Sequence, residues 1–341
     1  MDERLRELAA SRYRDGQRSL PRWKGSTSVP AGPHDERETW FAMVERRRSL
    51  VMPVPAEVPG PPAGVDVTEV RIPVTGGDCG NSSCTQCRRG SILARVYRAH
   101  GAVGRRPLHI NFHGGAFWLG GGEEMIRSNA WRHAPRSLAI DGVCIDVDYR
   151  MAPEHKYPVP GRDCYQALCW IVDNASTLGV DVDRVAIGGA SAGGALSAAV
   201  ALMARDEGGP PIAAQVLEIP VIESACNTLS MHRYSSGFVF ERGAAMDMWS
   251  LYLSAPSDAF EQYASPGHAT DLSRLPPAIV TIGEYDPLRD EGLAYASRLE
   301  AAGVPVAAEV FPMCHGAALP ETAEQVEQFV CAHLERLLTG F

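Results

Sequence analysis

The sequence predicts an α/β protein built on a mostly parallel central sheet of about eight strands flanked by helices. Short apolar runs rich in β-branched residues alternate with helical stretches from residue 66 onwards, and this alternation is typical of parallel sheets. The chain has 341 residues, of which 45% are hydrophobic and 21% are charged, as in ordinary globular proteins. That length suits one large α/β domain with an added helical cap.

Residues 1–52 are expected to form N-terminal cap helices. Apolar residues recur there at helical spacing, namely Leu5, Leu8, Ala9 and Tyr13 in a first stretch and Trp40, Met43 and Val44 in a second. Residues 53–65 are predicted to be an extended connector, because the segment VMPVPAEVPGPPAG around them carries five prolines, which exclude helix. Residues 66–341 would then hold the core of the protein.

Eight strands are expected in this core, at residues 67–74, 91–98, 107–113, 143–149, 184–190, 214–220, 278–284 and 306–311. Helices are expected near residues 124–140, 161–178, 192–206, 290–302 and 321–338. Turn-rich sequence rather than a helix separates the first two strands, which predicts an antiparallel hairpin at the sheet edge. Residues 221–265 are too long for an ordinary connection and are expected to be a further cap segment.

A serine stands at a glycine-rich corner between a predicted strand and a predicted helix. It is the centre of the segment GASAG at 189–193, in which Ser191 lies between Gly189 and Gly193. A turn tight enough to need two glycines strains the residue between them, and such strain is typical of functional sites. A helix beginning there also directs free N–H groups towards anything bound beside the hydroxyl. The segment predicts a nucleophilic serine at a strand-to-helix elbow.

Three more segments place useful groups at the ends of predicted strands. The residues HGGA at 113–116 would leave backbone N–H groups facing open space, as an oxyanion hole requires. Asp286 follows the strand at 278–284, with Asp290 as a nearby rival, and His315 lies in a loop before the last helix. The chain order Ser191, Asp286, His315 is the order of the α/β-hydrolase catalytic triad.

With these residues in view, the sequence resembles the hormone-sensitive-lipase-like carboxylesterase family of α/β-hydrolases over roughly residues 66–339. The resemblance rests on FHGGAF at 112–117, on DYRMAPEHKYPVPGRDCYQALCWI at 148–171, on RVAIGGASAGGALSA at 184–198, and on the segment 263–306. It implies the α/β-hydrolase fold with a helical cap, a serine esterase mechanism and no cofactor. The chain also lacks a P-loop lysine motif and a complete dinucleotide fingerprint.

By this resemblance and by their chemistry, Ser191 would attack an ester carbonyl, His315 would carry the proton, and Asp286 would orient the imidazole. The oxyanion hole is expected from the Gly114, Gly115, Ala116 and Ala192 region, through backbone N–H groups. His113 is expected to hold the glycine loop in shape. Aromatic residues of the loop and the cap are candidates for the substrate pocket wall, with core packing as the alternative: Phe117, Trp118, Phe238, Phe240 and Trp249.

The sequence departs from the family pattern without losing a catalytic group. Ala190 replaces the Asp or Thr that usually precedes the serine, and Ala116 replaces a glycine of the oxyanion loop. Ala317 stands where the family often has Phe, which would open space in the pocket. The cysteine-bearing hairpin is longer than is typical of the family.

The charge balance argues against a nucleic-acid partner, since 32 basic and 41 acidic residues give a net charge of −9. The basic triplet at 46–48 is expected to be a solvated helix face rather than a phosphate site. The charged start of the chain and the lack of an apolar run near ~20 residues predict a cytoplasmic protein without a membrane span.

Nine cysteines are present, and three of them cluster as Cys79, Cys84 and Cys87. This spacing lacks a nearby fourth ligand for a tetrahedral zinc site, so no metal is expected and the cluster is only a weak candidate. Reduced thiols or one redox-sensitive pair are the alternative. The other six cysteines are expected to be free thiols among apolar segments.

The function that these residues favour is a serine carboxylesterase with an acyl-enzyme on Ser191. Its substrates would be short- to medium-chain or aryl esters, a lactone or acetylated metabolite among them. The alternative is a non-hydrolytic member of the family, either a receptor-like protein that binds a small molecule or an acyltransferase or dehydratase with the same pocket. The sequence leaves the physiological substrate open. It also leaves the oligomeric state open, with a homodimer as one possibility.

Overall fold

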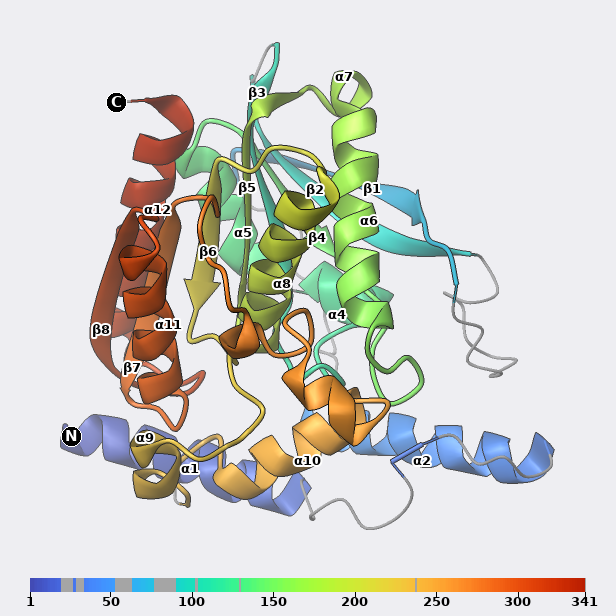
Figure 1. The fold of residues 1–341 in the computed structure, drawn as a ribbon, viewed down its shortest axis with the longest axis vertical. Coiled ribbons are helices and arrows are strands. Elements are labelled where there is room, and N and C mark those ends of the chain that lie inside the picture. The colour runs from blue at the N-terminus through green and yellow to red at the C-terminus, as the bar shows by residue number, and fades with distance from the viewer. Residues whose placement is uncertain are drawn as a thin grey trace.

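One eight-stranded sheet forms the centre of the computed structural model, which describes residues 1–19, 27–28, 34–52, 63–76, 90–101, 104–128, 130–236 and 238–340. The strand order is β1-β2-β4-β3-β5-β6-β7-β8 (Figure 1). The strands are β1 (Val65–Pro73), β2 (Ser91–Ala99), β3 (Arg106–Phe112), β4 (Val143–Val147), β5 (Val180–Ala190), β6 (Ala214–Glu218), β7 (Ala278–Tyr285) and β8 (Val306–Cys314). The predicted fold class is confirmed, because a strand occupies each of the eight expected places.

The sheet is antiparallel at one edge and parallel elsewhere. Strand β1 pairs antiparallel with β2 over its whole length, from Val65 opposite Ala99 to Pro73 opposite Ser91, which confirms the expected edge hairpin. Strand β2 pairs antiparallel with β4, and all pairs from β4 through β3, β5, β6 and β7 to β8 are parallel. The carboxyl ends of the parallel strands therefore meet at one edge of the sheet, where α/β folds carry their sites.

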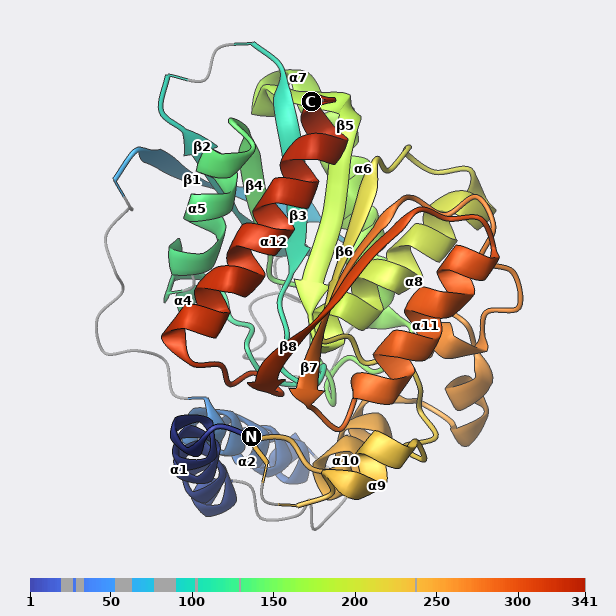
Figure 2. The same cartoon turned by 90° about the vertical axis from the view of Figure 1, so that its left-hand side faces the viewer.

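Helices cover both faces of the sheet (Figure 2). One face carries α5 (Ala130–Ala139) and α12 (Pro320–Thr339), and the other carries α6 (Val159–Asp173), α8 (Ala192–Glu207) and α11 (Arg289–Ala301). Successive strand residues alternate between the two buried clusters that result. Val216 of β6 lies in the cluster with α5 and α12, and Leu217 lies in the cluster with α6 and α8. Strands buried on both faces read as continuous apolar runs, which is why the sequence pattern located them well.

The helices over the sheet are α4 (Glu123–Ser128), α5 (Ala130–Ala139), α6 (Val159–Asp173), α7 (Ala175–Leu178), α8 (Ala192–Glu207), α11 (Arg289–Ala301) and α12 (Pro320–Thr339). Two of the expected helices are each observed as two, since α4 and α5 fill the interval 124–140 and α6 and α7 the interval 161–178. Asn174 follows the last residue of α6, and both its backbone N–H and its side-chain amide donate to the Trp170 carbonyl, at 3.0 and 2.8 Å.

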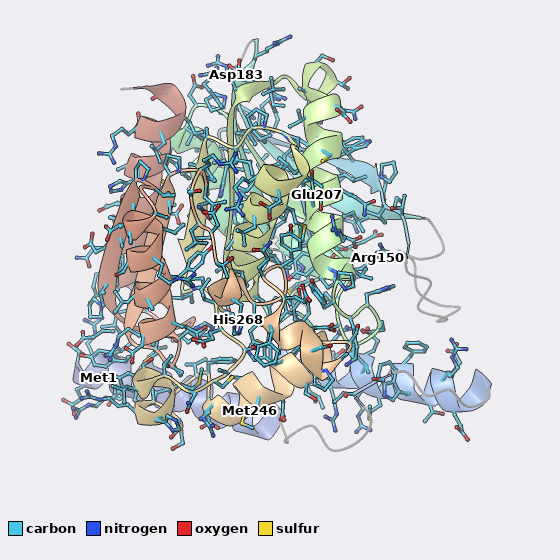
Figure 3. All side chains as sticks on the ribbon, in the orientation of Figure 1. Met1, Arg150, Asp183, Glu207, Met246 and His268 are labelled. Atoms are coloured by element: carbon cyan, nitrogen blue, oxygen red, sulfur yellow. The ribbon has the colours of Figure 1, made fainter. Side chains whose placement is uncertain are left out.

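Four helices lie across the carboxyl edge of the sheet, namely α1 (Glu3–Ser19), α2 (His34–Val51), α9 (Leu229–Arg233) and α10 (Arg242–Tyr252) (Figures 1 and 2). Two short 3₁₀ helices follow, η1 (Pro256–Phe260) and η2 (Pro266–His268). Figure 3 labels Met1 and Met246 at this end of the molecule and Asp183 at the opposite end. Most of the proline-rich connector, residues 53–62, lies outside the described residues.

Leu5 and Ala9 of α1 are buried against Cys314 and Ala317, which flank His315. In α2, Trp40, Phe41 and Val44 form a small buried cluster of their own. The N-terminal helices are therefore packed directly onto the edge where the strands end. No described helix combines the length and the apolar character that crossing a bilayer requires.

Candidate active site

Ser191 lies at the sharp turn between β5 and α8. Its φ is 57° and its ψ is −117°, a conformation that costs a non-glycine residue energy. The turn is held from both sides, because the Ser191 N–H donates to the Glu218 carbonyl at 2.8 Å and the Ser191 carbonyl accepts from the Val221 N–H at 3.2 Å. The strained serine therefore has a supporting frame in β6 and the residues after it.

The two glycines of the elbow are required by close backbone approach. A Cβ added at Gly193 would lie 1.9 Å from the Phe112 carbonyl oxygen, and one added at Gly189 would lie 2.3 Å from the same atom. Helix α8 and strand β3 therefore approach so closely that no side chain fits between them. The sixteen-residue helix α8 begins at Ala192, so the positive end of its dipole lies beside the serine hydroxyl.

A chain of hydrogen bonds joins the three residues that the sequence singled out. Ser191 Oγ lies 2.9 Å from His315 Nε2, and His315 Nδ1 lies 2.8 Å from Asp286 Oδ2. A carboxylate only accepts, so Nδ1 carries the imidazole proton and Nε2 is free to accept from the serine hydroxyl. All three side chains are buried, with exposures of 9% for Ser191, 8% for His315 and 1% for Asp286.

Asp286 rather than Asp290 faces the histidine. Oδ1 of Asp286 accepts the Leu288 N–H at 2.8 Å, which leaves Oδ2 for the imidazole. Asp290 is turned away, because Oδ2 accepts the Ser230 N–H at 2.7 Å and Oδ1 accepts from Arg289 Nε at 3.0 Å. The rival aspartate thus holds the start of α9 onto α11.

The glycine loop after β3 lies against the serine elbow. A Cβ added at Gly114 would come within 2.7 Å of the Ala190 carbonyl oxygen and 3.6 Å of Ser191 Cβ. Three consecutive residues of the loop have positive φ, at 119° for Gly115, 55° for Ala116 and 63° for Phe117. Among the described residues, none accepts a hydrogen bond from the N–H groups of Gly115, Ala116 and Ala192.

His113 supports this loop from behind, as the sequence suggested. Its Nδ1 lies 2.8 Å from the Gly114 carbonyl, and its ring stacks on Tyr149 at a centroid distance of 4.1 Å. The Tyr149 hydroxyl donates to the His113 carbonyl at 2.8 Å. Burial lowers the pKa of His113 to about 4, so the ring is neutral near pH 7 and Nδ1–H is the donor to Gly114.

The five aromatic pocket candidates lie in different surroundings. Phe240 lies beside the histidine, with its ring centroid 4.8 Å from that of His315. Phe117 is fully buried and stacks on Tyr252 at 3.9 Å, with Trp249 at 5.6 Å. Trp118 packs in a cluster with Leu119, Ala152 and Leu251, and Phe238 packs with the cluster of α1 around Cys314 and Ala317. Phe240 is therefore the candidate placed at the triad.

Two sequence-based expectations are wrong. Ala317 does not open space, since it is 1% exposed and covered by Leu5 and Ala9 of α1. The triplet at 46–48 is not uniformly solvated, because the Arg48 side chain is only 14% exposed and pairs with Glu154 at 2.7 Å. Both errors have one cause, since the N-terminal helices pack onto distant parts of the chain that helical periodicity does not identify.

Sequence reasoning missed Glu291, a buried carboxyl group near Asp286. It is 2% exposed, and its Oε1 accepts the N–H groups of Ile222 at 2.7 Å and Glu223 at 3.2 Å. Burial, followed by the charges of Asp286 and Glu223, raises the pKa of Glu291 to about 8. Glu291 therefore shapes the segment whose Val221 N–H binds the Ser191 carbonyl. Its place in DPLRDEG, beside Asp286, was the only indication in the sequence.

The six described cysteines are free thiols, with Cys144, Cys164, Cys226 and Cys314 buried and Cys169 and Cys331 partly buried. The cluster Cys79, Cys84 and Cys87 lies outside the described residues. Within the part of the chain that the structure describes, no group of three His, Cys, Asp or Glu side chains is arranged to hold a metal ion.

Comparisons with known proteins find related hydrolases. A family model described as the alpha/beta hydrolase fold matches residues 109–319. An arylesterase of Saccharolobus solfataricus is 42% identical over 199 residues, which are 58% of this chain and 63% of that protein. Carboxylesterase NlhH of Mycobacterium tuberculosis is 38% identical over 230 residues, which are 66% of this chain and 70% of that protein. The match to the arylesterase thus spans less than two thirds of its length.

Among solved structures, a bacterial heroin esterase is similar over almost the whole chain. The TM-score is 0.73 at 31% sequence identity, with 97% of this chain and 98% of the other covered. The likeness therefore extends beyond the family match and includes the N-terminal part of the chain.

Proposed function

Since this chain belongs to the α/β-hydrolase fold family, in its hormone-sensitive-lipase-like carboxylesterase branch, we propose that it is a serine carboxylesterase. The observation that carries the proposal is the continuous hydrogen-bond chain from Ser191 Oγ through His315 to Asp286, at 2.9 and 2.8 Å. The similarity to an arylesterase and a carboxylesterase supports the same reaction class.

In the acylation step, His315 Nε2 accepts the Ser191 proton as Oγ bonds to the ester carbonyl carbon. The carbonyl π electrons move to the oxygen, and a tetrahedral oxyanion forms. Its collapse breaks the bond to the leaving alcohol, which takes the proton from His315. In the second step His315 Nε2 accepts a proton from water as the water oxygen bonds to the acyl carbon. Collapse of this second oxyanion breaks the bond to Ser191 Oγ, which takes the proton back from His315, and the acid is released. Asp286 keeps the imidazole in the tautomer that accepts from serine and stabilises the charged ring.

The oxyanion is assigned to the N–H groups of Gly115, Ala116 and Ala192. They lie on the loop and the helix start that flank Ser191, and they have no acceptor among the described residues. Loss of one such donor typically costs about a hundred- to a thousand-fold in rate. Gly114 contributes by its missing side chain, because a Cβ there would strike the Ala190 carbonyl.

We assign short- to medium-chain or aryl esters as the substrate class, with Phe240 as a wall beside His315. The relatives do not favour the receptor-like or the acyltransferase and dehydratase alternatives, since their names describe esterases. We further propose a division of the chain into cap residues 1–52, a connector at 53–65 and a core at 66–341 with a further cap segment at 221–265. A cytoplasmic location and a homodimer are also proposed. Cell fractionation would test the cytoplasmic location, and the molecular mass from analytical ultracentrifugation would test the homodimer.

The test is an assay of the wild type and Ser191→Ala on p-nitrophenyl esters from acetate to dodecanoate. We expect turnover in the wild type, with a maximum among the shorter acyl chains, and a loss of at least about a thousand-fold in the variant, whose oxyanion hole and binding site remain. A folded wild type that hydrolyses none of these esters would refute the proposal.

A further inference from the structure

Arg48, near the end of α2, uses all five N–H donors of its guanidinium. Nη1 donates to Glu154 at 2.7 Å and to Glu45 at 2.5 Å, and Nη2 donates to Glu154 and to the Ala152 carbonyl, both at 2.7 Å. Nε donates to the Trp118 carbonyl at 2.8 Å. The Glu154 side chain is only 9% exposed, so its pairing with Arg48 is shielded from water.

The Trp118 carbonyl comes directly after the strained part of the glycine loop. Residues 115–117 all have positive φ, and such a run persists only where its surroundings hold it. The carbonyl of Phe117, the last of these residues, and that of Trp118, the next one, have partners from outside the loop: Phe117 O accepts the Ala152 N–H at 3.0 Å, and Trp118 O accepts from Arg48 Nε at 2.8 Å. Arg48 also donates to the Ala152 carbonyl, so the two residues that anchor the loop are bonded to each other.

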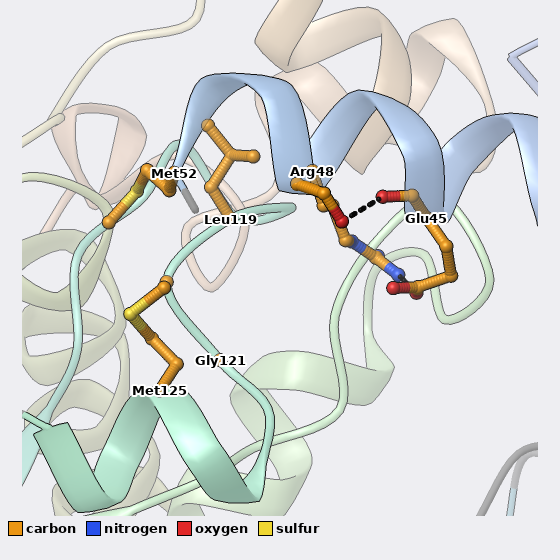
Figure 4. A pocket seen from close by; sticks show the side chains of 8 residues that line it. Glu45, Arg48, Met52, Leu119, Gly121 and Met125 are labelled. Atoms are coloured by element: carbon orange, nitrogen blue, oxygen red, sulfur yellow. Dashed lines mark hydrogen bonds and ion pairs between the residues drawn. The ribbon is translucent and has the colours of Figure 1, made fainter. Parts of the chain in front are cut away.

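Apolar contact between α2 and the loop is incomplete. Val51 of α2 packs against the cluster of Trp118, Leu119 and Ala152. Beside that contact lies a cavity of about 80 Å³ between α2 and the residues after the loop (Figure 4). Its lining residues are Glu45, Arg48, Ser49, Met52, Leu119, Gly120, Gly121 and Met125. At the cavity α2 and the loop lack dispersion contacts, and Arg48 joins the two there by hydrogen bonds.

We propose that Arg48 is a positioning residue that couples the seating of helix α2 to the shape of the oxyanion loop. The proposal rests on the esterase function assigned above. When α2 is seated, Arg48 fixes the Trp118 carbonyl and orients the N–H groups of Gly115 and Ala116 for the oxyanion. When α2 leaves, the loop loses that anchor and Glu154 loses its ion-pair partner. Helix α2 thereby controls the shape of the oxyanion hole.

Arg48→Lys tests this coupling, with the exposed Arg46→Lys as the matched control on the same helix. Lysine keeps a positive charge for Glu154 but offers three donors at one point, so it cannot serve all the acceptors of Arg48. We expect kcat for p-nitrophenyl butyrate to fall about ten- to a hundred-fold with KM changed less than about two-fold, because only the transition state uses the loop. Arg46→Lys should match the wild type.

Hydrogen–deuterium exchange provides a readout that needs no ester turnover. In Arg48→Lys, the amides of α2 and of residues 115–119 should exchange faster together. Faster exchange in α2 with unchanged exchange at 115–119 and unchanged kcat would overturn the coupling, and so would an equal loss of kcat in Arg46→Lys. If Arg48→Lys does not fold, Glu154→Gln, which keeps an acceptor but no charge, is subject to the same two criteria. A wild type inactive on every ester would refute the esterase function, while exchange would still decide the coupling.

Discussion

Asp286→Asn should reduce catalysis by about four orders of magnitude, because neither orientation of the amide satisfies both neighbours. In the wild type Oδ2 accepts from His315 Nδ1 and Oδ1 accepts the Leu288 N–H, each at 2.8 Å. If the amide oxygen faces Leu288, its NH₂ donates to His315 Nδ1, and the proton moves to Nε2. An imidazole protonated at Nε2 cannot accept from the serine hydroxyl.

If the amide is reversed, its NH₂ meets the Leu288 N–H and a buried donor loses its acceptor, at a cost of about 1–3 kcal/mol. The first orientation therefore dominates and holds the wrong tautomer. A ten-thousand-fold loss of kcat corresponds to about 5 kcal/mol of transition-state free energy, at about 1.4 kcal/mol for each factor of ten.

The assay compares kcat and KM of Asp286→Asn and Asp290→Asn with those of the wild type on p-nitrophenyl butyrate, after thermal unfolding has shown that each variant is folded. Asp290 binds Ser230 and Arg289 instead of the histidine, so its variant should keep kcat within about three-fold. A loss below about ten-fold in Asp286→Asn, or a larger loss in Asp290→Asn, would refute the assigned orientation of His315.

Two further predictions concern the frame of the site. Gly193→Ala should leave an inactive protein destabilised by several kcal/mol in urea unfolding, because the new Cβ would lie 1.9 Å from the Phe112 carbonyl oxygen. Gly292→Ala is the control inside α11, where the nearest atom to the new Cβ lies at 3.7 Å, and it should be neutral or stabilising. Equal losses of stability in the two variants would contradict this prediction. Glu291 has its pKa raised from 4.5 to about 8, so its contribution to stability is complete below about pH 4 and is lost as the pH rises to about 8. The free energy of unfolding should therefore fall between pH 5 and pH 8 by at most about 1.4 kcal/mol per pH unit, and Glu291→Gln should remove this dependence. Urea unfolding of both proteins at pH 5, 7 and 9 is the measurement, and the same pH dependence in the variant and the wild type would contradict the prediction.

The order of strands and helices could be predicted from the sequence because the relevant preferences are local. Apolar runs such as the one ending at Phe112 need neighbours on both faces wherever they lie, and proline and glycine limit the backbone by their own geometry. The GASAG elbow belongs to the same class of feature. Close backbone contact with Phe112 requires Gly189 and Gly193, and any strand-to-helix corner of this kind would need them.

Only the tertiary structure decided which groups meet across the fold. His315 and Ser191 are separated by 124 positions, and the choice of Asp286 over Asp290 depends on how the turn after β7 directs each carboxylate. Arg48 reaches the Trp118 carbonyl 70 positions away, and α1 covers Ala317. The periodicity of α1 and α2 indicates an apolar face but carries no information on what that face will contact. Those contacts follow from the register of the strands and the packing of helices over their ends, which no short window of sequence contains.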